Sequence, residues 1–121
     1  MIFTDIFLLN ETKAKMVSAV LINEGLNDIQ EIDLDISPER NEIYNILGGR
    51  ATFVGQWEQL DVVIIKRASD DGSLNLNKLP SPFYDETIFG PILLVRMDEE
   101  SENQDFTLPE YTDFSLFRRD V

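Results

Sequence analysis

The chain contains no cysteine and no histidine, and these two absences exclude much of the chemistry that proteins commonly use. Without cysteine there is no disulfide framework, thiol nucleophile, iron–sulfur cluster or Cys-based zinc site. Without histidine there is no Ser–His or Cys–His nucleophile pair, and the usual general base near neutral pH is missing. Any general acid–base catalysis would have to use carboxylates, Lys, Tyr or a bound metal. We therefore expect a protein that is not an enzyme and that uses no cofactor and no metal.

Long apolar segments are also missing. No apolar run approaches the roughly 20 residues that a membrane-spanning helix needs. The apolar start of the chain carries Asp5 and no basic segment, which is unlike a secretory signal. We therefore expect an intracellular protein. The length of 121 residues fits a single domain, 1–121, and a hydrophobic content of 43% supplies a core without a disulfide or a metal.

Basic residues are scarce, because 10 Lys and Arg stand against 23 Asp and Glu, for a formal net charge of −13. Direct binding to nucleic acid or to an anionic membrane surface needs Lys and Arg, so neither is expected. Two interpretations of the acidic excess remain open. It suits a protein partner with a basic surface, or it simply keeps the protein soluble.

Five segments have the composition of strands. Ile32, Leu34 and Ile36 alternate with acidic residues, which is typical of a strand with one buried and one solvated face. Residues 60–65 are nearly all apolar and are predicted to form a central strand covered on both faces. Residues 16–22 form a short β-branched run, for which a short helix is the alternative. The full set of predicted strands is 16–22, 29–36, 51–54, 60–65 and 88–95.

The segments around these strands have their own signals. Residues 2–9 are apolar and β-prone, so residues 1–13 are predicted to be an N-terminal extension or an edge strand. Gly55 is predicted to end the strand before it. Asp71-Gly72 predicts a hairpin turn that returns residues 74–77 alongside 60–65. Residues 98–103 predict an acidic, exposed turn, whose spacing matches no EF-hand calcium loop.

Two short helices are marked by their ends. Ser37 followed by Pro38 predicts a capped helix start, and Gly48-Gly49 predicts its end, with one Gly in the left-handed conformation. Thr107 and Glu110 form a capping-box pattern that opens a C-terminal helix over 107–117. Since strands and helices do not alternate regularly, we predict an α+β fold with a mixed, mostly antiparallel sheet of about five or six strands and two short helices.

Several short motifs are shared with a known group of proteins. They are Leu47-Gly48-Gly49, Leu60-Asp61-Val62-Val63-Ile64, Asn75-Leu76-Asn77-Lys78-Leu79-Pro80, Gly90-Pro91-Ile92-Leu93-Leu94-Val95 and Asp105-Phe106-Thr107-Leu108-Pro109-Glu110-Tyr111. From Ala19 onward, the chain resembles small uncharacterised domains of bacteriophages and of large algal DNA viruses. The resemblance implies a viral origin and a setting in the host cytoplasm or nucleus, or in the virion. It implies no activity and no functional residue.

Glu31, Asp33 and Asp35 are the first interaction candidates. Alternate residues of a strand lie on one face about 7 Å apart, which is similar to the separation of successive phosphates along a nucleic-acid strand. Together with the net charge of −13, this spacing motivates the hypothesis of a nucleic-acid mimic that occupies the basic groove of a DNA-binding enzyme. The ordinary solvent face of a half-exposed strand is the alternative.

Aromatic residues are the other interaction candidates. Trp57 is expected either in a partly exposed turn, as an interface anchor, or packed over the edge of the core. Phe83 and Tyr84 either line a groove for a partner or cover the sheet. Phe114 and Phe117 either form a docking end or belong to a fraying terminus.

These observations favour an acidic viral accessory or virion-associated protein that acts by binding a protein partner with a basic surface. Self-association of the chain stays open. The nucleic-acid mimic is the second hypothesis, and a carboxylate- or metal-dependent enzyme is the third.

Overall fold

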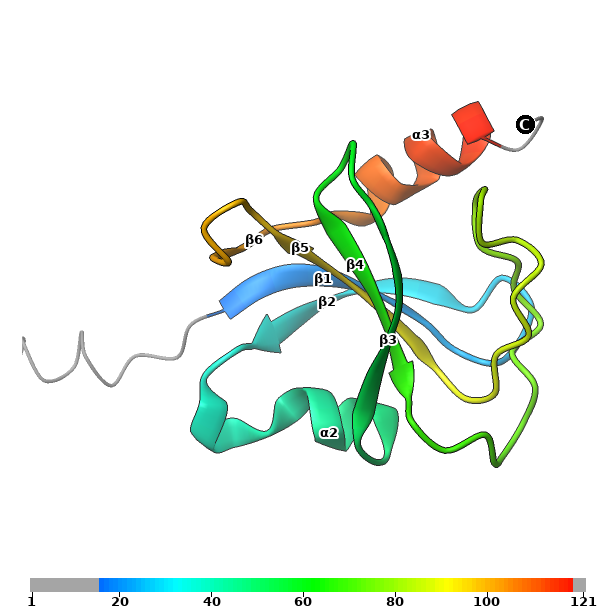
Figure 1. Cartoon of the computed structure of the whole chain (residues 1–121), viewed down its shortest axis with the longest axis horizontal. Helices are drawn as coiled ribbons and strands as arrows, with labels where there is room; N and C mark the ends of the chain where they lie inside the picture. The colour runs from blue at the N-terminus through cyan, green and yellow to red at the C-terminus, as the bar shows by residue number, and fades with distance from the viewer. Residues whose placement is uncertain (1–15, 119–121) are drawn as a thin grey trace, which may run out of the picture.

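The computed structural model describes residues 16–118 and is organised around one antiparallel sheet, whose strands lie in the order β2-β1-β5-β4-β3 (Figure 1). A short strand, β6, pairs with β5 off this path. The described elements are β1 (Met16–Ile22), β2 (Ile29–Asp35), η1 (Pro38–Arg40, a 3-10 turn), α2 (Glu42–Leu47), β3 (Ala51–Trp57), β4 (Val62–Arg67), β5 (Ile92–Met97), β6 (Asn103–Gln104) and α3 (Leu108–Arg118). The predicted α+β fold, with a mostly antiparallel sheet and two short helices, is confirmed. The extension or edge strand predicted over 1–13 lies outside the described residues.

The centre of the sheet is β5, which has β1 on one side and β4 on the other. Residues 92–95 are all buried, as expected of a strand that is covered on both faces. Strand β5 begins at Ile92 and not at Ile88, because Gly90 at φ 85 turns the chain just before it. As predicted for 60–65, β4 lies inside the sheet, between β5 and β3, but it is covered less completely than expected, because Val63 and Ile65 are only partly buried.

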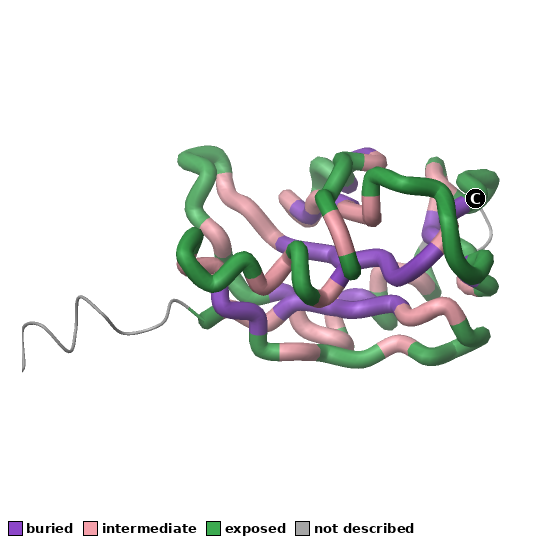
Figure 2. Tube along the Cα trace, turned by 90° about the horizontal axis from the view of Figure 1, so that it is seen from below, coloured by how far each residue is buried: buried purple, intermediate pink, exposed green. Residues whose placement is uncertain are grey.

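The sheet separates two hydrophobic clusters, which we name by the helix that covers each. Figure 2 shows the buried residues mainly along the strands in the middle of the molecule, with the exposed ones around them. The buried residues of the α3 face are Val20, Ile22, Trp57, Val62, Ile64, Leu79, Ile88, Ile92, Leu94, Phe106 and Tyr111. Those of the α2 face are Ala19, Leu21, Leu34, Leu47, Leu93 and Val95. Since successive residues of a strand point to opposite faces, β1 and β5 contribute alternately to both clusters.

The C-terminal helix begins with the capping box that the sequence predicts. The Glu110 backbone N–H donates to Thr107 Oγ1 (3.3 Å), and the Thr107 backbone N–H donates to Glu110 Oε1 (3.1 Å). A third free N–H of this helix end, that of Leu108, donates to Glu31 Oε1 across the sheet (2.9 Å). The apolar side chains of Leu108, Tyr111 and Phe114 belong to the cluster on the α3 face. The start of α3 is therefore determined by neighbouring residues in the sequence, and a hydrogen bond to Glu31 also attaches it to β2.

The first helix differs from its prediction. Ser37 makes no side-chain capping hydrogen bond, and Asn41 adopts a left-handed conformation (φ 50) between η1 and α2. Because a left-handed residue interrupts the helical backbone, α2 begins only at Glu42. Gly48 ends the helix at φ 77 and donates its N–H to the Tyr44 carbonyl, so the predicted glycine cap is confirmed.

The break predicted at Gly55 was also wrong, because β3 continues through it with a β-bulge between Phe53 and Gly55. The glycine has another role here. A Cβ at Gly55 would lie 2.3 Å from Cε1 of the Phe83 ring, so the missing side chain allows the ring to approach the strand. Strand β3 therefore extends to Trp57, and residues 58–61 turn the chain into β4.

Residues 74–77 do not form the predicted hairpin. Strand β4 already pairs with β3 on one edge and with β5 on the other, so no edge of β4 is free for them. Instead, two asparagines of this loop hold neighbouring turns. Asn75 Nδ2 donates to the carbonyls of Ile22 (3.2 Å) and Gly90 (2.9 Å), and Asn77 Nδ2 donates to the Asn23 carbonyl (2.9 Å).

Candidate functional site

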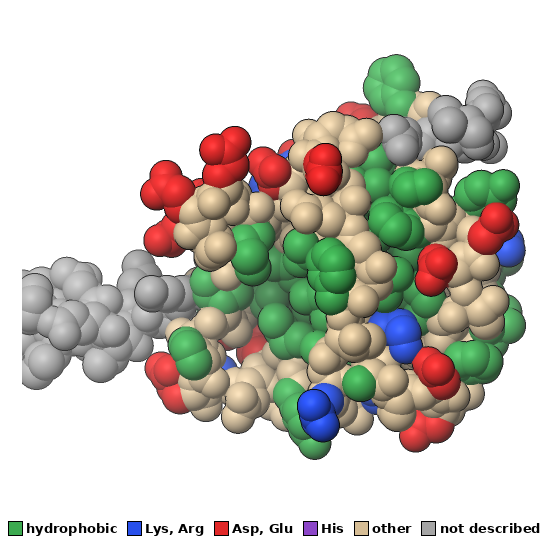
Figure 3. Space-filling model, viewed as in Figure 1, with side chains coloured by type: hydrophobic (Ala, Val, Ile, Leu, Met, Phe, Trp, Pro, Cys, Tyr) green, Lys and Arg blue, Asp and Glu red, His purple; other side chains and the backbone are tan. Residues whose placement is uncertain are grey.

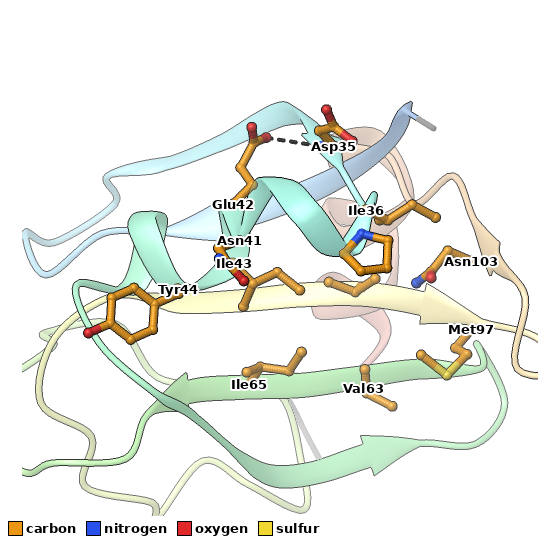
Figure 4. Close-up of a pocket in the computed structure, with 12 residues that line it drawn as sticks. Asp35, Ile36, Asn41, Glu42, Ile43, Tyr44, Val63, Ile65, Met97 and Asn103 are labelled. Atoms are coloured by element: carbon orange, nitrogen blue, oxygen red, sulfur yellow. Dashed lines mark hydrogen bonds between the residues drawn. The ribbon is translucent and has the colours of Figure 1, made fainter. Parts of the chain in front are cut away.

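The α2 face carries an open groove, with a volume of about 280 Å³, between α2 and β4. Figure 4 shows side chains of α2 on one side of the groove and side chains of β4 on the other, with β5 between them. We call this feature the α2 groove. Its lining residues are Asp35, Ile36, Pro38, Asn41, Glu42, Ile43, Tyr44, Val63, Ile65, Val95, Met97 and Asn103.

The groove exists because α2 is too short to cover the sheet. The helix has 6 residues and buries Leu47 against the sheet. Ile43 and Ile46, its other apolar side chains on this face, pack there only partly buried. The side chains of Val63 and Ile65 on β4 consequently have no helix over them. An apolar sheet face normally lies under a second layer, so this half of the face is incompletely covered.

Exposed apolar side chains extend this surface beyond the groove. Tyr44 on α2 is 53% exposed, and Phe53 on β3 is 61% exposed. Phe53 is the cross-strand partner of Ile65, so the two side chains lie on the same face of the sheet. Figure 3 shows hydrophobic side chains gathered around a hollow in the middle of this face. The α2 face is therefore a broad apolar surface with a groove in it.

Local hydrogen bonds hold the polar end of the groove. The Asp35 backbone N–H donates to Glu42 Oε1 (2.9 Å), the dashed line in Figure 4, and Asp35 Oδ1 accepts from the Ser37 N–H (2.9 Å). Asp35 Oδ2 also lies 3.5 Å from Nε of Arg40. Hydrogen bonds from the Ser37 backbone and side chain, assisted by the Arg40 charge, lower the pKa of Asp35 despite its partial burial. This carboxylate is therefore ionised and stabilises the turn that leads into α2.

An acidic turn stands at another end of the groove. Met97 and Asn103 line the groove and pair with each other, and residues 98–102 connect them. Asp98 Oδ1 accepts hydrogen bonds from the backbone N–H groups of Glu100 and Glu102, both at 2.9 Å. These bonds, with one from the Gln104 side chain, lower the pKa of Asp98. The predicted exposed acidic turn is thus confirmed, and Figure 3 shows its carboxylates beside the hollow.

The lining of the groove is mostly apolar, so the groove suits the binding of apolar groups. Among residues 16–118, no group of three or more Asp and Glu side chains is placed to hold a metal ion. Glu110, on the other face, is also ionised: burial would raise its pKa, but hydrogen bonds from Arg96 and Thr107 and the Arg96 charge outweigh burial and lower it. Burial raises the pKa of Tyr111 to about 12, so this phenol stays protonated near neutral pH.

The three acidic candidates predicted from the alternation do not form a free row. Glu31 accepts the hydrogen bond that caps α3, and Asp35 is engaged in the turn before α2. Asp33 is exposed. Two of the three carboxylates thus have structural roles within the chain. Nothing in their placement adds support to the nucleic-acid mimic.

The aromatic candidates are mostly parts of the α3 face. Trp57 is 1% exposed and donates from Nε1 to the Ser81 carbonyl (3.2 Å), so of its two expected positions the structure shows packing in the core and not a partly exposed turn. The rings of Phe83 and Phe114 pack against Trp57, with centroid distances of 5.9 and 5.3 Å. Tyr84 is 49% exposed and Phe117 is 85% exposed. Of these five residues, only Tyr84 and Phe117 remain open to a partner.

Sequence reasoning missed the aliphatic residues of the groove, namely Ile36, Ile43, Val63, Ile65, Val95 and Met97. Four of them, Ile36, Val63, Ile65 and Val95, lie in the strands that the sequence predicts, where an apolar pattern indicates burial and not a groove. One available signal was the short distance between Pro38 and Gly48, which limits any helix to a few turns. A short helix next to a strand that is apolar on both sides indicates incomplete coverage.

Fold and groove together define a class: a small antiparallel α+β domain with an apolar groove beside a short helix. Residues 20–114 match the model of a family of unknown function (DUF5880), and the chain belongs to this family. The matched region begins one residue after Ala19, where the resemblance seen in the sequence also begins. No curated protein and no solved structure matches the chain.

In the part of the chain that the structure describes, no helix is long and apolar enough to cross a membrane.

Proposed function

We propose that this protein acts by binding another protein through its α2 face, and that the partner presents a basic surface. The observation that carries the proposal is the incompletely covered half of this face, where the partly buried Val63 and Ile65 of β4 line an open apolar groove. A contiguous apolar surface of this kind costs solubility and commonly marks an interaction site. The opposite face of the same sheet is closed by α3, so the exposure is specific to one side.

The acidic charge of the chain supports a partner with a basic surface. The chain carries a net charge of −13, and the acidic turn at 98–102 stands beside the groove. Apolar contacts inside the groove would supply most of the affinity, whereas the surrounding carboxylates would speed the approach of a basic partner and disfavour an acidic one. Within this proposal, the resemblance to phage and algal-virus domains suggests an intracellular accessory protein of a virus.

The test compares two tyrosines with matched exposure. Tyr44 lines the α2 groove and is 53% exposed, whereas Tyr84 lies outside it and is 49% exposed. Tagged protein, Tyr44→Ala and Tyr84→Ala are each used to capture partners from cells that produce the protein. We expect Tyr44→Ala to reduce the recovery of a specific partner at least about fivefold, as for an interface contact worth about 1 kcal/mol, with Tyr84→Ala unchanged.

Both substitutions remove exposed side chains, so each should change the free energy of unfolding by about 0.5 kcal/mol or less. Urea titration of the three proteins checks this condition. If the same partners are recovered equally well with Tyr44→Ala and with the original protein, the α2 face is not the binding surface and the proposal is wrong.

A further inference from the structure

We propose that the ligand of the α2 groove is an amphipathic helix of the partner protein, which places apolar side chains in the groove and Lys or Arg side chains along its acidic margin. This inference rests on the proposed function, because it specifies which part of the α2 face binds and what kind of segment binds there. Volume, backbone pairing and charge each support it.

The size of the groove suits a few side chains and not a single large ligand. Its volume is about 280 Å³, roughly twice that of a 150 Å³ apolar cavity that holds benzene. Two aliphatic or aromatic side chains fill such a space. Side chains at positions i and i+4 of a helix lie about 5–6 Å apart on one face, so a single helical turn presents two of them together.

The backbone of the sheet favours a helix over an extended peptide. The groove lies over β4 and β5, and each of these strands already pairs with a neighbour on both edges. An extended segment placed there would find no unpaired backbone groups and would leave its own unpaired. A helix satisfies its own backbone and packs on a sheet face by side chains alone. The ligand would thus lie beside α2 and complete the layer that α2 begins.

The charges around the groove favour basic side chains on that helix. Glu39 on η1 and Glu99, Glu100 and Glu102 on the acidic turn are exposed near the groove residues Pro38, Met97 and Asn103. Arg40, also on η1, is paired with Asp35. Lys or Arg side chains flanking the apolar stripe of a helix would meet these carboxylates. A second copy of this chain would bring another net charge of −13 to the same surface, which disfavours self-association there.

The test uses a defined probe and the full chain. The probe is a synthetic helical peptide of about 15 residues, with Leu on one face and Lys and Ala on the other, and its matched control has Glu in place of every Lys. Methyl signals of Val63, Ile65 and Val95 report on the groove, and those of Leu76 and Leu116, which do not line it, report on other surfaces. We expect saturable shifts of the groove signals with the Lys peptide, at least about tenfold weaker binding of the Glu peptide, and a smaller difference at high salt.

Several results would overturn the inference. Equal affinities for the two peptides remove the charge argument, and shifts confined to Leu76 and Leu116 place the ligand elsewhere. Groove signals that change with protein concentration alone assign the groove to a second copy. If the groove signals of the double variant Phe3→Asp, Phe7→Asp differ from those of the original protein without any peptide, the occupant of the groove is the apolar segment 2–9 of this chain. The two proposals can fail separately. If neither peptide binds but a partner is still captured in a Tyr44-dependent way, this inference is wrong and the proposed function keeps its support.

Discussion

The two faces of the sheet use alternate residues of the same strands, yet one is closed and the other is open. On the α3 face, an 11-residue helix, Phe106 and the loop that carries Leu79 and Phe83 enclose Trp57. On the α2 face, a 6-residue helix covers part of an equally apolar surface and leaves a groove. The comparison shows that the hydrophobicity of a strand does not decide whether its side chains are covered. The length and anchoring of the opposite layer decide it.

The two helices also differ in how they are anchored. Helix α3 is attached through Glu31 of β2 at its N-terminus and through the ion pair between Arg96 and Glu110 (2.8 Å). Its aromatic side chains then pack around Trp57. Helix α2 is held by Glu42 at its start and by Arg67, whose Nη1 donates to the Leu47 carbonyl (3.0 Å) at its end. Hydrogen bonds fix both ends of α2, but its middle contributes little burial.

The strongest test of the comparison is to remove one large aromatic side chain from each face. Trp57→Ala deletes a fully buried side chain and its hydrogen bond to Ser81, so we expect a loss of about 3–5 kcal/mol in the free energy of unfolding. Tyr44→Ala on the open face should change it by about 0.5 kcal/mol or less. Urea denaturation measures both values. Similar losses for the two variants would mean that the α2 face is not open in solution.

A smaller effect is expected where β3 approaches the aromatic cluster of the closed face. In Gly55→Ala, the added Cβ would lie 2.3 Å from Cε1 of Phe83, so the ring or the strand must move, at a cost of about 1–3 kcal/mol. Gly25→Ala is a matched control, because its nearest neighbour is an ordinary contact at 3.8 Å.

The Gly55 prediction can be checked with a double-mutant cycle. Once Phe83→Ala has removed the ring, Gly55→Ala should cost clearly less than it does in the original chain, because the two positions are in contact. Thermal or urea unfolding of the four proteins gives the coupling. Strictly additive losses would show that the contact between Gly55 and the ring is not what restricts this position.

The smallest effects concern one carboxylate on each face. Glu110 and Asp35 both have a lowered pKa in the folded chain. Each ionised carboxylate therefore stabilises the folded chain at pH values above its unfolded pKa, which is near 4.5 for Glu110 and 3.8 for Asp35. This stability is lost as the pH falls through the lower pKa of the folded state. Glu110→Gln and Asp35→Asn should be less stable than the original protein at pH 7, and both differences should shrink on acidification. Urea titrations at several pH values measure this, and differences that stay constant down to low pH would contradict it.

Much of the fold could be predicted where the signal is local. The alternation of Ile32 and Leu34 with acidic residues indicated β2, and Thr107 with Glu110 indicated the start of α3. The errors arose where distant contacts override local preference. Gly55 resembles a strand breaker but instead makes room for Phe83, and Asp71-Gly72 resembles a hairpin turn although β4 has no free edge beside it. Of the candidate site, the sequence predicts the acidic turn at 98–103, and Asp35, one of its interaction candidates, also lines the groove.

The sequence by itself determined the composition-based exclusions, the acidic excess, the apolar strands, the start of α3 and the glycine end of α2, because each depends on residue type or on neighbours along the chain. Only the tertiary structure decided that Trp57 is enclosed, that Glu31 caps a helix, and that Val63 and Ile65 remain only partly buried beside α2. The physical reason is that coverage of a side chain depends on which distant segments pack over it. A strand residue has the same local pattern whether a helix lies above it or not.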